Sequence, residues 1–182
     1  MNGERLVYVM GPSGAGKDTL LEHVRAYTPA PRVLFAHRYI TRARNHHENH
    51  IELSEVEFEA RSALGLFALE WSSHALRYGI GIEIDAWMDR ACMVVVNGSR
   101  AYLPEALARY PRMAVVHVTA EPPVLARRLA ARGRETVDQI QARLARSVPW
   151  AVPPGATLTT IDNSGALDDS AAVFLDLLRR LA

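Results

Sequence analysis

The strongest constraint on the fold is a glycine-rich segment near the N-terminus, which reads Gly11, Pro12, Ser13, Gly14, Ala15, Gly16, Lys17. It follows the short apolar run Leu6–Met10, which is typical of a buried strand, and it precedes a stretch whose apolar spacing predicts a helix over residues 18–26. In the order strand, G-x-x-x-x-G-K and helix, the pattern predicts a loop whose backbone N–H groups converge on phosphate oxygens. The helix N-terminus adds a partial positive charge that favours the same anion.

Lys17 is the only lysine among the 21 basic residues of the chain; all the others are arginine. We predict that its compact ammonium group reaches the β- and γ-phosphates of ATP and stabilises the transferred group. The residue after this lysine is usually serine or threonine, but here it is Asp18, with Thr19 next. Because carboxylate oxygens suit Mg²⁺, we predict Asp18 as the metal ligand, with Thr19 as the alternative.

The rest of the chain alternates between apolar strand-like runs and amphipathic helical stretches. Strands are predicted near 33–36, 93–96, 114–118 and 157–161, and helices near 102–109, 122–131, 137–146 and 166–181. Ser54, followed by Glu57 and then Phe58, is a capping-box pattern that predicts the start of a further short helix. This alternation predicts an α/β fold of three layers, with helices on both faces of a parallel central sheet. At 182 residues, the chain is predicted to form one domain.

Composition narrows the class of protein further. The 21 basic and 20 acidic residues nearly balance, so no broad field favours nucleic acid or a membrane surface. No apolar stretch approaches the roughly 20 residues that span a bilayer, and a single cysteine excludes an internal disulfide. We therefore expect a soluble cytoplasmic protein. A homodimer is compatible with the sequence, although the apolar positions of the C-terminal helix favour core packing over a dimer surface.

Several segments beyond the loop resemble the guanylate-kinase-like branch of P-loop kinases. They are Tyr39–Arg42, Asn49–Phe58, Leu69–Trp71, Tyr78-Gly79 and an arginine cluster at 127–134, and the resemblance covers about residues 5 to 148. It implies an acceptor-binding subdomain at about 36–90 and an arginine-rich lid at about 127–146. Within the lid, Arg128 and Arg132 are the expected contacts to ATP.

The acceptor side departs from guanylate kinase and resembles the ribose 1,5-bisphosphate phosphokinase family instead. The stretches that carry this likeness are the loop with its Asp18, Ala36–Arg42, Glu48–His50 and Val96–Arg100. Neutral groups and arginine in place of base-reading carboxylates suit an acceptor that is rich in phosphate. The resemblance implies phosphorylation of ribose 1,5-bisphosphate by ATP and Mg²⁺ to 5-phosphoribosyl 1-diphosphate, within phosphonate breakdown.

The candidate site residues follow from the loop and the resemblance together. Lys17, Arg42 and Arg128 are the predicted catalytic residues, since a phosphate acceptor is already ionised and transfer needs mainly alignment and charge neutralisation. The predicted acceptor contacts are Arg38, Arg42, His50, Glu70, Tyr78, Asn97, Ser99 and Arg100. For the arginines, a solvated surface position is the competing interpretation, and for Tyr78 it is core packing.

Three other functions share parts of this pattern. A guanylate or other nucleoside-monophosphate kinase has the same fold and chemistry, but it would read a base at the acceptor pocket. A guanylate-kinase-like binding module without activity would not need the complete loop with Lys17. A regulatory nucleotide switch would not need the arginine-rich lid. Tight ATP binding without transfer to a small acceptor would favour the last two.

Overall fold

A computed structural model describes residues 2–28, 32–43, 49–73, 75–131, 133, 136–145, 149–153 and 156–181. Its central feature is a five-stranded parallel sheet in the order β2-β7-β1-β8-β9. The strands are β1 (Leu6–Met10), β2 (Val33–Phe35), β7 (Met93–Asn97), β8 (Ala114–Thr119) and β9 (Leu158–Asp162). The helices are α1 (Lys17–Tyr27), α2 (Glu55–Ala63), α3 (Glu83–Asp89), α4 (Leu103–Arg109), α5 (Pro122–Ala131), α6 (Val137–Ala145) and α7 (Leu167–Leu181).

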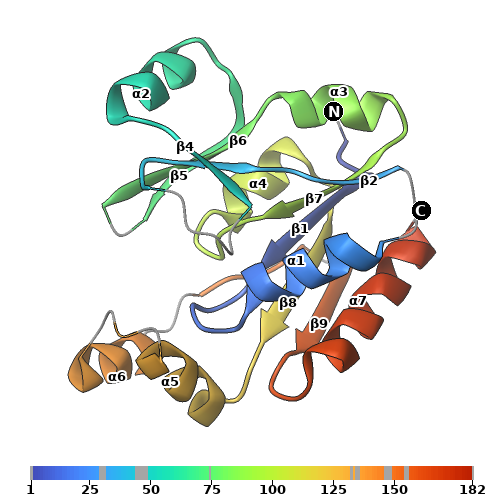
Figure 1. Cartoon of the computed structure of the whole chain (residues 1–182). Helices are drawn as coiled ribbons and strands as arrows, with labels where there is room; N and C mark the ends of the chain where they lie inside the picture. Colours follow the sequence, from blue (N-terminus) through green and yellow to red (C-terminus); the bar gives the residue numbers. More distant parts are fainter. Residues whose placement is uncertain are drawn as a thin grey trace.

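Helices cover both faces of this sheet, so the predicted three-layer α/β architecture is confirmed (Figure 1). Side chains of β1 alternate between the faces: Leu6, Tyr8 and Met10 join the core under α3 and α4, whereas Val7 and Val9 join the core under α1 and α7. A strand buried on both faces favours a continuous apolar sequence, and β1 is apolar throughout. Its neighbours β7 and β8 are apolar except for Asn97, His117 and Thr119. The apolar face of α7 also packs into this core, as predicted, although Val173 is exposed.

A second, four-stranded sheet lies beside the first and was not predicted from the sequence. Its strands are β3 (Arg38–Ile40), β4 (His50–Glu52), β5 (Phe67–Ser73) and β6 (Leu76–Gly81), in the order β4-β3-β6-β5. β3 pairs parallel with β4 and antiparallel with β6. Leu69 and Ile80 of this sheet belong to the same core cluster as α3 and α4, so the two sheets share one apolar core.

The sequence placed the elements of the central sheet to within one or two residues. The serine half of the predicted capping box is present, since the Ser54 hydroxyl accepts the Glu57 N–H at 3.1 Å before α2 begins. The Glu57 carboxylate, however, bonds Arg61 four residues later at 2.6 Å. β2 also has three residues, but they are all apolar, whereas β3 and β4 each contain charged or polar residues and so give no strand signal.

A buried polar cluster joins α3 to the end of α4. The Tyr110 hydroxyl donates to Asp85 Oδ1 at 2.5 Å, and Arg109 Nη2 donates to Asp85 Oδ2 at 3.0 Å. Tyr110 is fully buried, and burial together with the Asp85 carboxylate raises the pKa of its phenol. The hydroxyl therefore stays protonated and serves as a permanent donor to the carboxylate.

We expect Tyr110→Phe to lower the free energy of unfolding by about 1.5–3 kcal/mol, because it removes a buried hydrogen bond to a charged group. Urea unfolding with an unchanged m value is the measurement. Tyr27→Phe is the matched control, since Tyr27 is 65% exposed. Equal changes in the two variants would contradict a structural role for the Tyr110 hydroxyl.

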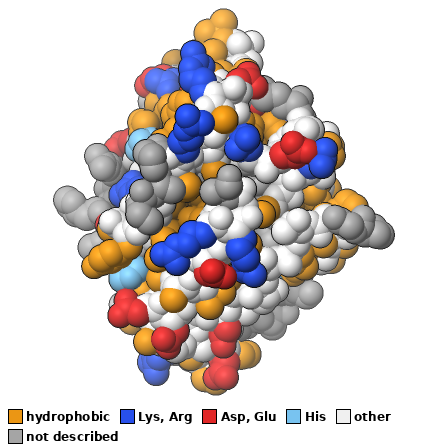
Figure 2. Space-filling view, turned by 90° about the vertical axis from the view of Figure 1, so that its right-hand side faces the viewer, with side chains coloured by type: hydrophobic (Ala, Val, Ile, Leu, Met, Phe, Trp, Pro, Cys, Tyr) orange, Lys and Arg blue, Asp and Glu red, His pale blue; other side chains and the backbone are white. Residues whose placement is uncertain are grey.

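The molecular surface carries mixed charge. Figure 2 shows basic and acidic side chains interspersed with apolar ones on one face, in keeping with the formal net charge of +1. No helix in the described part of the chain is long and apolar enough to cross a membrane.

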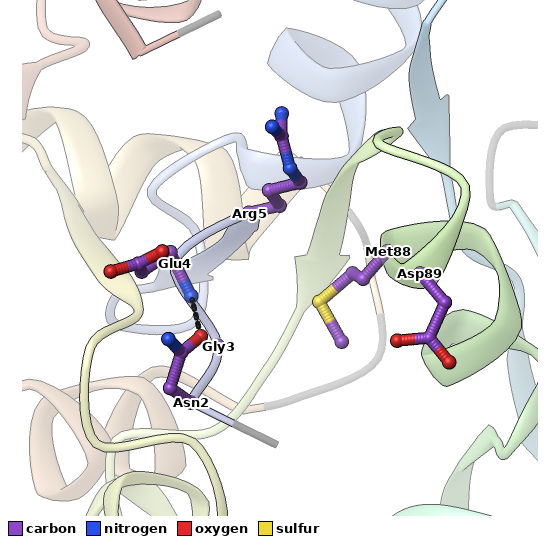
Figure 3. Close-up of a pocket in the computed structure, with 6 residues that line it drawn as sticks. All are labelled: Asn2, Gly3, Glu4, Arg5, Met88 and Asp89. Atoms are coloured by element: carbon purple, nitrogen blue, oxygen red, sulfur yellow. Dashed lines mark hydrogen bonds between the residues drawn. The ribbon is translucent and has the colours of Figure 1, made fainter.

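A small pocket lies at the start of β1, lined by Asn2, Gly3, Glu4, Arg5, Met88 and Asp89 (Figure 3). Inside it the Glu4 N–H donates to Asn2 Oδ1 at 3.2 Å. The glycine-rich loop follows the other end of β1, about 16 Å away for a five-residue strand. This pocket is therefore separate from the candidate site.

Candidate phosphate-binding and phosphoryl-transfer site

The glycine-rich loop connects the end of β1 to the start of α1, as predicted. Gly16 has φ 80°, in the left-handed region, directly before the first residue of the helix, Lys17. The Lys17 ammonium lies inside the loop, where Nζ donates to the carbonyl oxygens of Gly11 at 2.9 Å and Pro12 at 3.1 Å. The loop thus combines converging backbone groups, a helix N-terminus and a fixed cation, which together suit a polyphosphate.

Asp18 connects the loop to the second sheet and to the end of β7. Its Oδ1 accepts a hydrogen bond from Arg38 Nη2 at 2.6 Å and another from Asn97 Nδ2 at 2.7 Å. Arg38 begins β3 and Asn97 ends β7, so three predicted site residues from distant parts of the chain meet here. The Arg38 and Asp18 side chains are 13% and 31% exposed, which leaves this ion pair partly open to solvent.

The donor set around Asp18 fits a magnesium ion of the kind that phosphates and water mostly hold. Such an ion needs only one or two protein carboxylates, and the Asp18 side chain remains partly exposed beside the loop. Within the described ranges, no group of three or more His, Cys, Asp or Glu residues could form an all-protein metal site. Thr19 is exposed, so Asp18 remains the better candidate.

The segment after β7 is held in place by a tyrosine of β1. The Tyr8 hydroxyl accepts the Ser99 N–H at 2.9 Å and donates to the Ser99 carbonyl oxygen at 2.8 Å. Gly98 is required for this contact, because a Cβ at that position would overlap the Tyr8 ring. Ser99 and Arg100 therefore stand at the carboxyl ends of the parallel strands, where ligands of open α/β sheets bind.

The remaining predicted acceptor contacts lie in or next to the second sheet. Glu70 accepts from Arg77 Nη2 at 2.8 Å and from Ser62 Oγ at 2.8 Å, so its carboxylate stabilises this sheet. The Tyr78 ring stacks on Trp71 at 5.4 Å between centroids. His50 is buried in β4, and Arg42 is half-buried just beyond β3.

The segment predicted to form a lid, about residues 127–146, contains the second half of α5 and the whole of α6. Arg128 of α5 reaches the loop, where Nη1 lies 3.5 Å from the Ala15 carbonyl oxygen, whereas Arg127 is exposed. Arg132 and Arg134 lie outside the described residues, so the predicted ATP contact of Arg132 remains a prediction.

Two residues near the loop were missed by sequence reasoning. Asn163 follows β9 and donates from Nδ2 to the Ala15 carbonyl oxygen at 2.7 Å. His117 lies in β8 opposite Met10, and its ring packs against Trp150 at 4.7 Å. The signal for His117 was a polar residue inside an apolar strand. The signal for Asn163 was an amide directly after a strand of the central sheet.

His117 lies in an environment that disfavours its charged form. Burial lowers the pKa of the imidazole below 6.5, and the positive charges of Arg100 and Lys17 lower it further. His117 Nε2 is buried and has no hydrogen-bond partner among the described residues. The side chain is therefore neutral at pH 7.

The lowered pKa predicts a pH dependence of stability. Below pH 6.5 the unfolded chain binds a proton at residue 117 that the native protein does not, so stability falls as the pH falls toward the native pKa. In His117→Phe, which retains a ring, we expect a shallower loss of melting temperature between pH 7 and pH 5. Thermal unfolding across this range is the measurement, and parallel curves for the two proteins would contradict it.

Comparison with known proteins places this geometry in a family. Residues 7–148 match the family model of an AAA domain. The solved guanylate kinase from Anaplasma phagocytophilum superimposes with a TM-score of 0.66 at 13% identity, covering 96% of this chain and 84% of that one. A sugar kinase from Janibacter sp. HTCC2649 gives a TM-score of 0.55 at 19% identity, covering 98% of both chains. The fold and the loop thus define a P-loop protein with a guanylate-kinase-like fold.

Sequence relatives are more specific. A protein of Burkholderia pseudomallei (strain K96243) named ribose 1,5-bisphosphate phosphokinase PhnN is 65% identical over 182 residues, covering 100% of this chain and 99% of its own length. A protein of the same name from Achromobacter xylosoxidans (strain A8) is 52% identical over 180 residues, covering 98% of this chain and 94% of its own length. The chain belongs to the ribose 1,5-bisphosphate phosphokinase family.

Proposed function

We propose that this protein transfers the γ-phosphoryl group of ATP to ribose 1,5-bisphosphate, forming 5-phosphoribosyl 1-diphosphate and ADP, as a step in phosphonate breakdown. The observation that carries the proposal is 65% identity over the whole chain to a protein named for this kinase activity. The loop geometry supports it, because Lys17 and the glycine-rich backbone form a polyphosphate site. The protein is proposed to act in the cytoplasm.

The reaction forms one bond and breaks one bond. An oxygen of the acceptor 1-phosphate attacks the γ-phosphorus of ATP, and the bond from that phosphorus to the β,γ-bridging oxygen breaks to release ADP. The attacking oxygen is already ionised, so no strong general base is needed, and the task of the protein is alignment and charge neutralisation. Bound Mg²⁺ would neutralise phosphate charge in this step.

The residues of the site divide this task. The loop and Lys17 hold the ATP phosphates, Arg128 approaches from α5, and Asp18 is the proposed Mg²⁺ ligand. Arg38 and Arg100 supply positive charge on the acceptor side, where two polyanions must approach each other. Because Asp18 bonds Arg38 and Asn97 directly, the nucleotide and acceptor halves of the site are joined at one carboxylate.

A guanylate or other nucleoside-monophosphate kinase is the alternative that shares this mechanism. The end of β7 distinguishes the two, because a neutral amide, Asn97, engages Asp18 there, and Ser99 and Arg100 follow. This arrangement favours a phosphate-rich acceptor over a guanine edge that donates hydrogen bonds.

The test is ³¹P NMR of the purified protein with Mg-ATP in three tubes, with ribose 1,5-bisphosphate, with GMP, or without acceptor. We expect diphosphate doublets in addition to those of ADP in the sugar tube, and intact ATP without acceptor. Turnover of GMP alone would reject the sugar as acceptor and retain phosphoryl transfer. Intact ATP in all three tubes would reject the kinase function.

A further inference from the structure

The inference concerns Asn163, which packs behind the glycine-rich loop although it lies 148 residues away in the chain. Asn163 is 3% exposed. Its Nδ2 donates to the Ala15 carbonyl oxygen at 2.7 Å, and its Oδ1 accepts from Ser170 Oγ at 2.8 Å. Its backbone N–H donates to the Thr119 carbonyl oxygen at 2.8 Å, at the end of β8. The backbone of Asn163 is therefore anchored to β8, and its side chain to α7 and to the loop.

The chemistry of these partners fixes the orientation of the amide. A carbonyl oxygen only accepts hydrogen bonds, so the NH₂ group of Asn163 must face Ala15. The Oδ1 atom then faces the Ser170 hydroxyl, which supplies the donor. Ser170 is 3% exposed, so water does not compete for this bond. The reverse orientation would place Oδ1 against the Ala15 carbonyl oxygen, where no hydrogen bond can form.

Anchoring the Ala15 oxygen determines the direction of the next N–H group. In a planar trans peptide, the C=O of one residue and the N–H of the following residue point to opposite sides. Since the Ala15 oxygen points to the buried Asn163, the Gly16 N–H points away from that side chain, toward the opposite face of the loop. Backbone N–H groups directed to that face are what a phosphate cradle requires.

The glycine at position 16 is matched to this anchor. Its φ of 80° lies in the left-handed region, and a Cβ there would stand 2.6 Å from Asn163 Nδ2. Glycine thus permits both the backbone conformation and the close approach of the amide. Arg128 Nη1 also approaches the Ala15 oxygen, but at 3.5 Å its contact is much longer than that of Asn163.

We propose that Asn163, oriented by Ser170, is a positioning residue that holds the Ala15–Gly16 peptide so that the Gly16 N–H faces the triphosphate of ATP. This inference rests on the proposed function only in taking ATP as the ligand of the loop. It predicts that loss of the amide weakens ATP binding by the folded protein and leaves the acceptor KM unchanged.

The experiment compares Asn163→Leu, which retains shape without donors, with Ser170→Ala and with the control Ser164→Ala. Ser164 lies in the same turn and bonds Glu121 and Asp162, with no hydrogen bond to the loop. The measurement is calorimetric titration with Mg-ATP, at a temperature where circular dichroism shows that each variant is folded. We expect the Kd for ATP to rise about ten- to a hundredfold in Asn163→Leu. Ser170→Ala should give a smaller increase, and Ser164→Ala a change within about twofold.

A second readout follows the peptide itself. In ¹H–¹⁵N spectra of the protein without nucleotide, the Gly16 amide resonance should move in Asn163→Leu and stay in place in Ser164→Ala. A lower melting temperature with an unchanged Kd and an unmoved Gly16 resonance would overturn the inference and leave the proposed function standing. A different result is that the wild type binds ATP but transfers no phosphoryl group to the sugar, while Asn163→Leu binds ATP more weakly. This result would support the inference and reject the proposed acceptor.

Discussion

Lys17→Ala is expected to reduce kcat for phosphoryl transfer by about a thousandfold, the largest effect that we predict for a single side chain. The ammonium lies inside the loop, within hydrogen-bond distance of the Gly11 and Pro12 carbonyl oxygens, so its charge is positioned before ATP arrives. Charge stabilisation of this kind acts on the transition state and needs no rearrangement during the reaction. Initial rates of ADP release in the presence of the sugar acceptor are the measurement.

Two variants separate this effect from general loss of positive charge. Arg25→Ala removes an exposed cation from the last turn of the same helix, and we expect its rate to stay within about threefold of the wild type. Lys17→Arg retains the charge, but the planar guanidinium cannot reproduce the compact geometry inside the loop, so we expect a large loss here as well. Full activity of Lys17→Arg would show that charge alone is needed at this position.

Asp18→Asn is expected to lower kcat/KM by about a hundredfold and to raise the Mg²⁺ concentration needed for half-maximal activity. The substitution keeps the size of the side chain but removes the proposed anionic metal ligand and the charge that pairs with Arg38. A magnesium titration at saturating ATP is the measurement. The shift in magnesium dependence is the specific sign, because a folding defect alone would reduce activity equally at every magnesium concentration.

The matched control for this prediction is Asp89→Asn, which changes an exposed carboxylate at the opposite end of β1. It should leave both the rate and the magnesium dependence within about twofold of the wild type. If Asp18→Asn lowers the rate but leaves the magnesium dependence unchanged, Asp18 is not the metal ligand. Its role would then be to orient Arg38 and Asn97.

The central sheet and the loop were predictable because their signals are local. Leu6–Met10 is continuously apolar, and the glycines that follow it have fixed spacing to Lys17, so strand, loop and helix all follow from adjacent residues. The helix N-cap at Ser54 was predictable for the same reason. Elements with strong local patterns can be predicted from the sequence without knowledge of the tertiary contacts.

The second sheet and the contacts around the loop were not readable from adjacent residues. β3 and β4 have three residues each. They form strands because they pair with each other, and because β3 also pairs with β6. The contacts of Asp18 with Arg38 and Asn97 span 20 and 79 residues. Which polar side chains meet at the end of a sheet depends on strand order, and the strand order was not available from the sequence.

The second sheet comes from one uninterrupted stretch of chain, residues 38–81, whereas every strand of the central sheet lies outside that stretch. In evolutionary terms, residues 38–81 form a single insert between strands of the central sheet. If the insert selects the acceptor, new substrates can arise by altering one contiguous segment while the nucleotide-binding frame stays intact. Each new insert would then have to keep the Asp18–Arg38 ion pair, which joins the insert to the nucleotide-binding loop.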